Sequence, residues 1–233
     1  MSDQNSVSIK AQFLGAVIVL GGICLASGLG MALVYSGLRE SIEEKKQEAL
    51  GKRLEDVLGK QEEYPLLDVP ADTPVYYARQ DSHVLLATMG AAKGYQSTID
   101  VLVSVKVPDN GFDPDDPATW PEIGQETAVY RMAVVSSGET PGLGERIKEV
   151  SKDVSIWGRL RGETEPPGKR AAFQKEFDSV TWQNVALTSN GGEIDALTGA
   201  TITSRATVAA VRNGLASLQK ALQSADATEG GAE

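Results

Sequence analysis

The sequence predicts an α+β fold, with a single N-terminal transmembrane helix followed by a mixed α+β domain. A long run without charged residues extends from residue 11 to 38. Short runs rich in β-branched residues, one of them strictly alternating, follow between residues 75 and 137. Residues 204–225 instead carry apolar side chains at helical spacing. Strands with helices at both ends are typical of an α+β domain.

The composition fits this organisation. The chain has 233 residues, of which 41% are hydrophobic and 23% charged, as in a globular domain with a small appendage. We divide it into an N-terminal tail (1–10), a transmembrane helix (11–38), a juxtamembrane helix or linker (39–62), a folded domain (63–224) and a disordered tail (225–233).

The uncharged run exceeds the roughly 20 residues that a helix needs to span a bilayer. A cleaved signal peptide is the alternative, but its apolar core would be about 7 to 15 residues long and would end at small residues. This run is longer and continues through the bulky residues Leu33, Val34 and Tyr35. We therefore expect an uncleaved membrane anchor.

The segment after the anchor predicts a helix or stalk. Half of residues 37–60 are charged, and Leu50, Leu54 and Val57 recur at helical spacing. Three prolines between residues 63 and 74 then mark the start of the domain. More basic residues follow the anchor than precede it, which alone would place the domain in the cytoplasm. Long domains cross the membrane largely regardless of charge, so the charge count leaves the orientation open.

The domain begins with strand candidates. These are VYYAR (75–79), HVLLATMG (83–90), TIDVLVSVKV (98–107) and AVYRMAVVSS (128–137), and residues 173–188 add strand-like apolar content. In the third run, every second residue from Ile99 to Val107 is Ile or Val, which predicts one buried face.

An acidic stretch separates the last two of these strands. Its acids do not follow the spacing of a calcium-binding loop, and two prolines interrupt it. The acids are Asp109, Asp113, Asp115 and Asp116. We expect a solvated insertion in a hairpin, and we predict no metal site.

Charge and residue counts exclude several classes of function. The net charge of -10 argues against a nucleic-acid partner, because phosphate binding needs a basic face. A single cysteine, Cys24, excludes an intrachain disulfide and a cysteine-cluster metal site. The single histidine, His83, has no nucleophile motif near it, so we predict no catalytic residue. Redox chemistry in this chain would need an organic cofactor.

The segment DALTGATITSR (195–205) places several hydroxyls just before the final helix. Free amides and the positive end of a helix dipole favour phosphate there, and Arg205 could add a charge-assisted hydrogen bond. A hydroxyl at Thr201 would be well placed to carry a phosphodiester. The alternative is that Thr203 or Ser204 caps the helix and the other threonines are surface polar groups.

A second segment, SGETPGLGERI (137–147), is rich in glycine and proline. Such a loop is stiff and poor in side chains, so its amides can approach a ligand closely.

These segments resemble a known family. The flavinylation motif Asp-x-x-(Ser/Thr)-Gly-Ala-Thr is matched by Asp195, Thr198, Gly199, Ala200 and Thr201. Residues 139–147 resemble the second signature of the same FMN-binding domain. Residues 94–105 resemble its strand signature, with Gln96 where glycine is usual. With the N-terminal anchor, the chain resembles the G subunits of Rnf-type electron-transport complexes over about residues 10 to 220.

The resemblance implies roles for individual residues in an FMN-binding domain. In that family a flavin transferase moves FMN from FAD onto the last threonine of the motif, so Thr201 would carry FMN through a phosphoester. Asp195 would assist the transferase reaction. The remaining site residues would be Thr198, Gly199 and Ala200, which shape the site, and Glu139, Thr140, Pro141, Gly142, Leu143 and Gly144, which wall the flavin.

The resemblance also implies a function and a location. The chain would be a single-pass protein of the inner (cytoplasmic) membrane with its domain on the extracytoplasmic side. It would relay electrons in a complex that couples ferredoxin–NAD electron transfer to Na+ or H+ transport, as an electron carrier that is not catalytic alone. Its partners would be the other membrane and redox subunits, and the flavin transferase during maturation.

Two alternatives remain open. The C subunit of the Na+-translocating NADH:quinone reductase shares both motifs. A non-redox assembly or anchoring subunit could retain the motif without carrying flavin.

Overall fold

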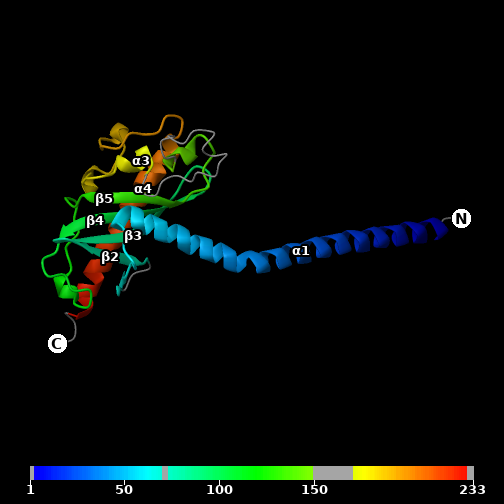
Figure 1. Cartoon of the computed structure of the whole chain (residues 1–233). Coiled ribbons are helices and arrows are strands. Elements are labelled where there is room, and N and C mark those ends of the chain that lie inside the picture. Colours follow the sequence, from blue (N-terminus) through cyan, green and yellow to red (C-terminus); the bar gives the residue numbers. More distant parts are fainter. Residues whose placement is uncertain (1–2, 70–72, 149–169, 230–233) are drawn as a thin grey trace, which may run out of the picture. The chain divides into compact units, whose positions relative to one another are not determined.

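The computed structural model describes residues 3–69, 73–148 and 170–229 (Figure 1). The chain separates into two units, Met1–Glu48 and Ala49–Glu233, which are described in turn.

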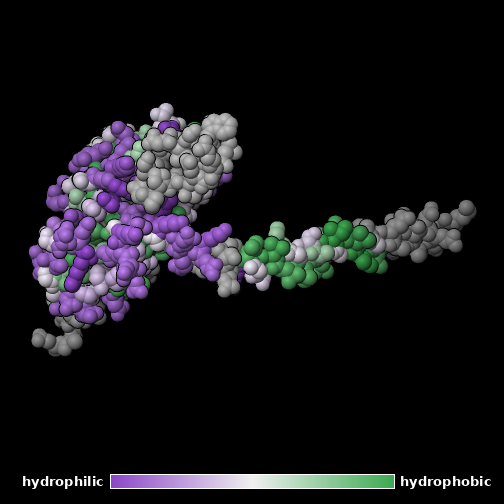
Figure 2. Space-filling model, viewed as in Figure 1, coloured by the Kyte–Doolittle hydropathy of each residue, from purple (hydrophilic) through white to green (hydrophobic). Residues whose placement is uncertain are grey.

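Helix α1 (Asp3–Leu58) makes up the first unit as far as Glu48, and its remaining turns, from Ala49, belong to the second unit. The segment Val17–Arg39, 23 residues long, is apolar enough to cross a membrane. Its side chains are exposed, and Figure 2 shows them as a hydrophobic band along the helix. The helix is continuous through the juxtamembrane segment that the sequence predicted separately.

Helix α1 ends inside the second unit, where it packs on the sheet. Leu54, Val57 and Leu58 are buried there. Gly59 stops the helix with a φ of 84°, a left-handed conformation that glycine adopts without strain. Its N–H donates to the carbonyl oxygen of Glu55 at 3.0 Å.

Five antiparallel strands form a sheet in sequential order (Figure 1). They are β1 (Leu66–Leu67), β2 (Val75–Gln80), β3 (His83–Lys93), β4 (Thr98–Pro108) and β5 (Val129–Ser136). The predicted strands at 75–79, 83–90, 98–107 and 128–137 are therefore confirmed, while the two-residue β1 was not predicted. β3 and β4 pair from His83↔Pro108 to Lys93↔Thr98 and form the centre of the sheet.

Both faces of the sheet are covered. The predicted face of β4, from Ile99 to Val107, is buried in the larger core. Helix α4 (Thr201–Glu229) covers this face with an apolar stripe of Val208, Val211, Leu215, Leu218 and Leu222. The other face packs against the end of α1, where the Ser104 hydroxyl donates to the Val57 carbonyl oxygen at 2.9 Å. This two-sided sheet confirms the predicted α+β class.

Helix α4 approaches the sheet most closely at two glycines. A Cβ on Gly90 of β3 would overlap the carbonyl oxygen of Ala210, and one on Gly214 would lie 2.7 Å from Val103 Cγ1. The helix runs to Glu229, so the predicted tail at 225–233 begins within it, and residues 230–233 lie outside the described part.

Residues 173–188 are not a strand, and this expectation was wrong. They form a short helix α3 (Ala172–Lys175) and the 3-10 helix η3 (Trp182–Asn184), and the 3-10 helix η4 (Thr188–Asn190) begins at their end. Their apolar side chains enter the core one at a time from turns, as Phe173, Phe177 and Trp182 do. An apolar run of this length is ambiguous between strand and buried turns by periodicity alone.

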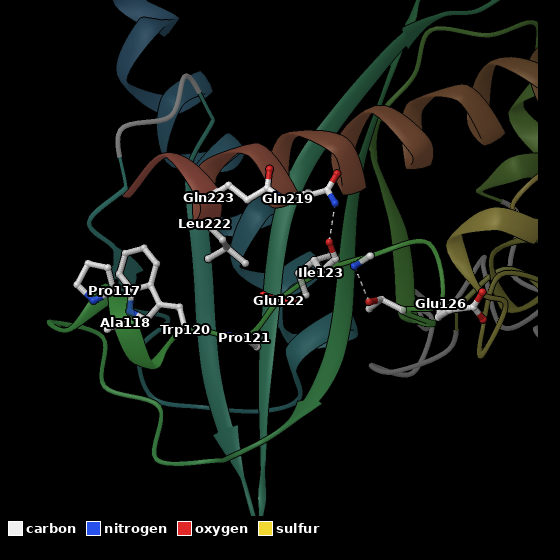
Figure 3. A pocket seen from close by; sticks show the side chains of 12 residues that line it. Pro117, Ala118, Trp120, Pro121, Glu122, Ile123, Glu126, Gln219, Leu222 and Gln223 are labelled. Atoms are coloured by element: carbon white, nitrogen blue, oxygen red, sulfur yellow. Dashed lines mark hydrogen bonds between the residues drawn. The ribbon is translucent and has the colours of Figure 1, made fainter. Parts of the chain in front are cut away.

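The acidic insertion connects β4 to β5 and contains the 3-10 helix η1 (Pro117–Thr119). The insertion was expected to be solvated, but it also packs against the domain, because Phe112 and Ile123 are buried in the core. The Gln219 side-chain amide donates to the Ile123 carbonyl oxygen at 2.7 Å (Figure 3). A hollow of about 580 Å³ lies between the insertion and the end of α4, lined by Trp120, Pro121 and Leu222 among others (Figure 3).

Candidate functional site

A cleft of about 640 Å³ lies where the loop after β5 meets the start of α4. It therefore brings together the two segments that the sequence singled out. The residues that line it are Tyr95, Glu139, Thr140, Leu143, Gly144, Gly199, Ala200, Thr201, Ile202 and Thr203. The hollow beside the acidic insertion contains none of these residues.

Helix α4 begins at the cleft. The Ala200 N–H donates to the Leu197 carbonyl oxygen at 2.9 Å, which makes a turn just before the helix. Gly199 in this turn has a φ of 79°, and a Cβ there would lie 3.3 Å from Leu143 Cδ2. The first amides of a helix have no intrahelical acceptor, so Thr201 lies at the positive end of the helix dipole.

The hydroxyls of this segment have different environments. Thr203 is 2% exposed and donates to a Glu139 carboxylate oxygen at 2.6 Å. Ser204 is fully buried, accepts from the Leu197 N–H at 3.0 Å and donates to the Ala200 carbonyl oxygen at 3.0 Å. Both lie in the first turn of α4, so neither is the residue that precedes the helix, as the capping alternative required. Thr201 is exposed and faces the cleft.

Glu139 lies beneath the cleft and is 5% exposed. Besides the Thr203 hydroxyl, its carboxylate accepts the backbone N–H groups of Tyr95 (3.3 Å), Gln96 (3.1 Å) and Ser97 (3.2 Å). Burial raises the pKa of Glu139, but the hydrogen bonds from Thr203 and these amides outweigh it, so the pKa lies below its usual value. The side chain is therefore held as a buried anion.

The walls of the cleft are apolar and exposed. Tyr95 is 68% exposed, Leu143 49% and Ile202 53%. Within the described part of Ala49–Glu233, Leu66 is the other large hydrophobic side chain with comparable exposure. Exposed apolar side chains that gather around one concave surface mark a ligand site.

Three of the lining residues were not among the predicted site residues: Tyr95, Ile202 and Thr203. The strand signature at residues 94–105 contains Tyr95, so the sequence held a signal for it. Ile202 and Thr203 directly follow Thr201 in the motif segment. Ile202 is exposed and Thr203 is buried, and this difference depends on how α4 is rotated about its own axis.

Other predicted residues lie close to the cleft without lining it. Pro141 and Gly142 form its outer turn, where Gly142 has a φ of 75° and both are exposed. Thr198 is exposed, and its carbonyl oxygen accepts from the Arg146 guanidinium at 3.4 Å. Arg205 is exposed four residues after Thr201, on the same face of α4.

Asp195 lies on the surface next to Glu176. Its carboxylate accepts from the Thr188 hydroxyl at 3.0 Å, and its N–H donates to a Glu176 carboxylate oxygen at 3.0 Å. Burial raises the pKa of Glu176, and the Asp195 charge adds to this effect against the opposing Asp195 N–H hydrogen bond.

The geometry suits a ligand that combines a phosphate with an apolar group. A hydroxyl at the positive end of a long helix is suited to the phosphate. Tyr95, Leu143 and Ile202 offer exposed apolar surface for the apolar part of such a ligand. Among the residues that the structure describes, no group of three acidic, histidine or cysteine side chains could hold a metal ion.

The sequence around this cleft defines the class of protein as one built on an FMN-binding domain. Residues 122–216 match the family model described as an FMN-binding domain, and they include the Glu139 loop and Thr201. The chain is also similar along most of its length to curated proteins named as the G subunit of the ion-translocating oxidoreductase complex. The relative from Pseudomonas aeruginosa (strain UCBPP-PA14) is 30% identical over 228 residues, which cover 88% of both chains.

Two further relatives carry the same name. The one from Pseudoalteromonas atlantica is 27% identical and covers 85% of this chain and 84% of its own. The one from Vibrio cholerae (strain O395) is 28% identical and covers 81% of each. The chain thus belongs to the family of ion-translocating oxidoreductase complex G subunits, which confirms the predicted resemblance.

Proposed function

We propose that this chain is the membrane-anchored, FMN-carrying electron-transfer subunit of an ion-translocating oxidoreductase complex of the Rnf type. The observation that carries the proposal is the exposed Thr201 hydroxyl at the start of α4, beside a cleft with exposed apolar walls. Bound FMN supplies redox chemistry that the protein's own side chains lack. In this account the complex couples ferredoxin–NAD electron transfer to Na+ or H+ transport, and this subunit relays the electrons.

FMN is attached covalently to Thr201. A flavin transferase presents FAD, and a bond forms between Thr201 Oγ1 and the phosphorus on the flavin side of FAD. The phosphoanhydride bond breaks, AMP leaves, and the hydroxyl proton is released to solvent or to the transferase. Asp195, the first residue of the motif, is exposed at the surface and assists in this step.

The environments of the neighbouring hydroxyls support Thr201 as the acceptor. Thr203 and Ser204 are buried and already donate hydrogen bonds within the domain. Thr198 is exposed but does not line the cleft. Of these four hydroxyls, Thr201 alone combines exposure with a position in the cleft at the positive end of α4.

The chain's residues hold the two ends of FMN differently. Amides at the start of α4, and Arg205 on the same helix face, attract the phosphate. Leu143, Ile202 and Tyr95 line the cleft and would contact the ring. The phosphate end is therefore the attachment site, and the loop after β5 tunes the midpoint potential of the ring.

The apolar segment Val17–Arg39 anchors the protein in the inner membrane, with the domain on the extracytoplasmic side. The family relatives, named as subunits of an ion-translocating complex, support partners among its other membrane and redox subunits.

The proposal is tested by producing the full chain together with a flavin transferase. We expect yellow fluorescence at the size of the chain after denaturing electrophoresis, because a phosphoester survives unfolding. Production without the transferase is the control and gives no fluorescent band. A folded chain that carries no covalent flavin in the presence of active transferase would contradict the proposal and favour a non-redox assembly subunit.

A further inference from the structure

The carboxylate of Glu139 joins three segments that are far apart in the sequence. Glu139 itself lies in the loop after β5. Its oxygens bind the turn between β3 and β4, at residues 95–97, and the first turn of α4, through Thr203. Each of the three segments also supplies one apolar wall of the cleft: Leu143, Tyr95 and Ile202.

We propose that Glu139 is the positioning residue of the flavin site. Its carboxylate fixes the β3–β4 turn and the first turn of α4 against the loop after β5. It thereby sets the separation of the cleft walls and the direction in which Thr201 presents its hydroxyl. The inference rests on the proposed function, since it concerns the loading of FMN onto Thr201.

The hydrogen bonds leave little freedom to this side chain. Oε1 accepts from Gln96 and Ser97, and Oε2 accepts from Tyr95 and Thr203. Four donors match the acceptor capacity of an ionised carboxylate. Each of the two carboxylate oxygens accepts from two donors. A rotation of the Glu139 side chain would therefore break several hydrogen bonds together.

Two glycines enclose the same carboxylate. A Cβ on Gly94 would lie 2.5 Å from Glu139 Oε1. A Cβ on Gly144 would lie 2.8 Å from Glu139 Cβ and 2.8 Å from Thr203 Oγ1. A separate hydrogen bond, from the Gly138 N–H to Ser97 Oγ at 2.7 Å, joins the same loop and turn at the rim. The segments approach so closely only because these positions lack side chains.

The positioning role makes Glu139→Gln informative, since it preserves shape but replaces one acceptor by a donor. If its NH2 faces Thr203, that hydroxyl can turn and accept, but the Tyr95 N–H loses its acceptor. If the NH2 faces the other way, the Gln96 and Ser97 N–H groups lose theirs. Either arrangement removes the acceptor of at least one backbone N–H in the β3–β4 turn and loosens this turn.

The test measures the rate at which purified flavin transferase loads FMN from FAD onto the detergent-solubilised full chain. The variants are Glu139→Gln, Thr203→Val and their combination, with Thr203→Ser as the conservative variant that keeps the hydroxyl. Glu145→Gln is the charge control, because Glu145 is exposed in the same loop. Val84→Ala is the stability control, because Val84 is fully buried in β3 near its end at His83, away from Gly94.

We expect Glu139→Gln and Thr203→Val each to slow loading about tenfold, the factor that matches one lost hydrogen bond to a charged group. The combined variant should be slowed by less than the product of the two single effects, because both substitutions loosen the same junction of three segments. Thr203→Ser and Glu145→Gln should load within about twofold of the parent. Val84→Ala should load at the parent rate even though its thermal midpoint is lowered.

Loading of folded Glu139→Gln at the parent rate would overturn the proposal, and so would equal slowing in Val84→Ala. If Glu139→Gln does not fold, the comparison of Thr203→Val with Thr203→Ser decides, and equal rates would overturn it. Thr201→Val separates this inference from the proposed function. Persistent loading on Thr201→Val contradicts the attachment site, whereas abolished loading there with normal Glu139 and Thr203 variants contradicts the positioning role alone.

Discussion

The hydroxyl of Thr203 donates a 2.6 Å hydrogen bond to the buried carboxylate of Glu139, across 64 positions of sequence. This contact joins the two motif segments and withdraws Thr203 from solvent. It leaves Thr201, two residues earlier and exposed, as the hydroxyl at the mouth of the cleft.

The lowered pKa of Glu139 predicts a pH dependence of stability. A carboxyl whose pKa is lower in the folded than in the unfolded state stabilises the fold above its ordinary pKa, here 4.5. This stabilisation is lost as the pH falls through the folded-state value. We expect the free energy of unfolding to fall more steeply below pH 4.5 in the parent than in Glu139→Gln, as measured by denaturant titrations of the full chain in detergent.

Glu176 must be separated from this effect, because its raised pKa contributes with the opposite sign and favours the fold at lower pH. Comparison of the parent with Glu139→Gln cancels the Glu176 contribution, which both proteins share. Parallel pH profiles would contradict the assignment of an ionised Glu139.

Gly144 predicts a steric effect on the same site. A Cβ there would press on Glu139 and Thr203, so Gly144→Ala should destabilise the domain by about 1 to 3 kcal/mol and reduce FMN loading. Gly124→Ala is the matched control, because a Cβ at Gly124 would meet open space. Thermal unfolding and flavin content of the two variants check this prediction. Equal thermal midpoints and equal flavin contents would contradict a steric effect of a side chain at Gly144.

Leu143 should tune the flavin without being needed to attach it. Its side chain is 49% exposed at the cleft, whereas attachment occurs at the phosphate end of FMN. Leu143→Ala should therefore keep covalent FMN but shift its midpoint potential, because burial and hydrogen bonding act differently on each charge state. A redox titration of fully loaded protein measures this, and an unchanged midpoint would place the ring elsewhere.

A substitution at Gly142 is a weaker test of whether the loop after β5 tunes the flavin midpoint potential. We predict that Gly142 also tunes the flavin, but its φ of 75° means that any side chain strains the outer turn. A Gly142→Ala variant should therefore lose stability whether or not this turn contacts the ring. Only a midpoint shift at unchanged flavin content would support contact.

Membrane topology gives a prediction that does not depend on flavin. The segment Val17–Arg39 should remain attached to the mature protein, and the acidic insertion should face away from the cytoplasm. An Asp115→Cys variant should react with a membrane-impermeant thiol reagent in intact cells, while Cys24, within the span, stays silent. Labelling only after lysis, or a mature N-terminus near Gly37, would contradict this topology.

The sequence predicted the elements whose residues repeat regularly. Alternation from Ile99 to Val107 identified β4, and the stripe from Val208 to Leu222 identified α4, because each pattern matches one buried face. Residues 173–188 failed because their large side chains enter the core from turns and leave no period to follow. The predicted boundary between anchor and juxtamembrane segment does not interrupt helix α1, which runs from Asp3 to Leu58.

The motif segments were predictable, but their joint geometry was not. Resemblance singled out Glu139 and Thr201 separately. That Glu139 turns inward to bind Thr203 and the amides at residues 95–97 depends on the long-range packing of β3, β4 and α4. No local pattern encodes that contact.

The attachment of FMN to Thr201 is tested most directly by Thr201→Val in chains produced with the flavin transferase. Peptide mass mapping locates the flavin, and Thr198→Ser, which keeps the motif, and Thr203→Ser serve as matched hydroxyl controls. The account predicts FMN on the Thr201 peptide of the parent and of both controls, and none on a folded Thr201→Val chain. Covalent FMN that persists in Thr201→Val, on Thr203 or on any other residue, would contradict it.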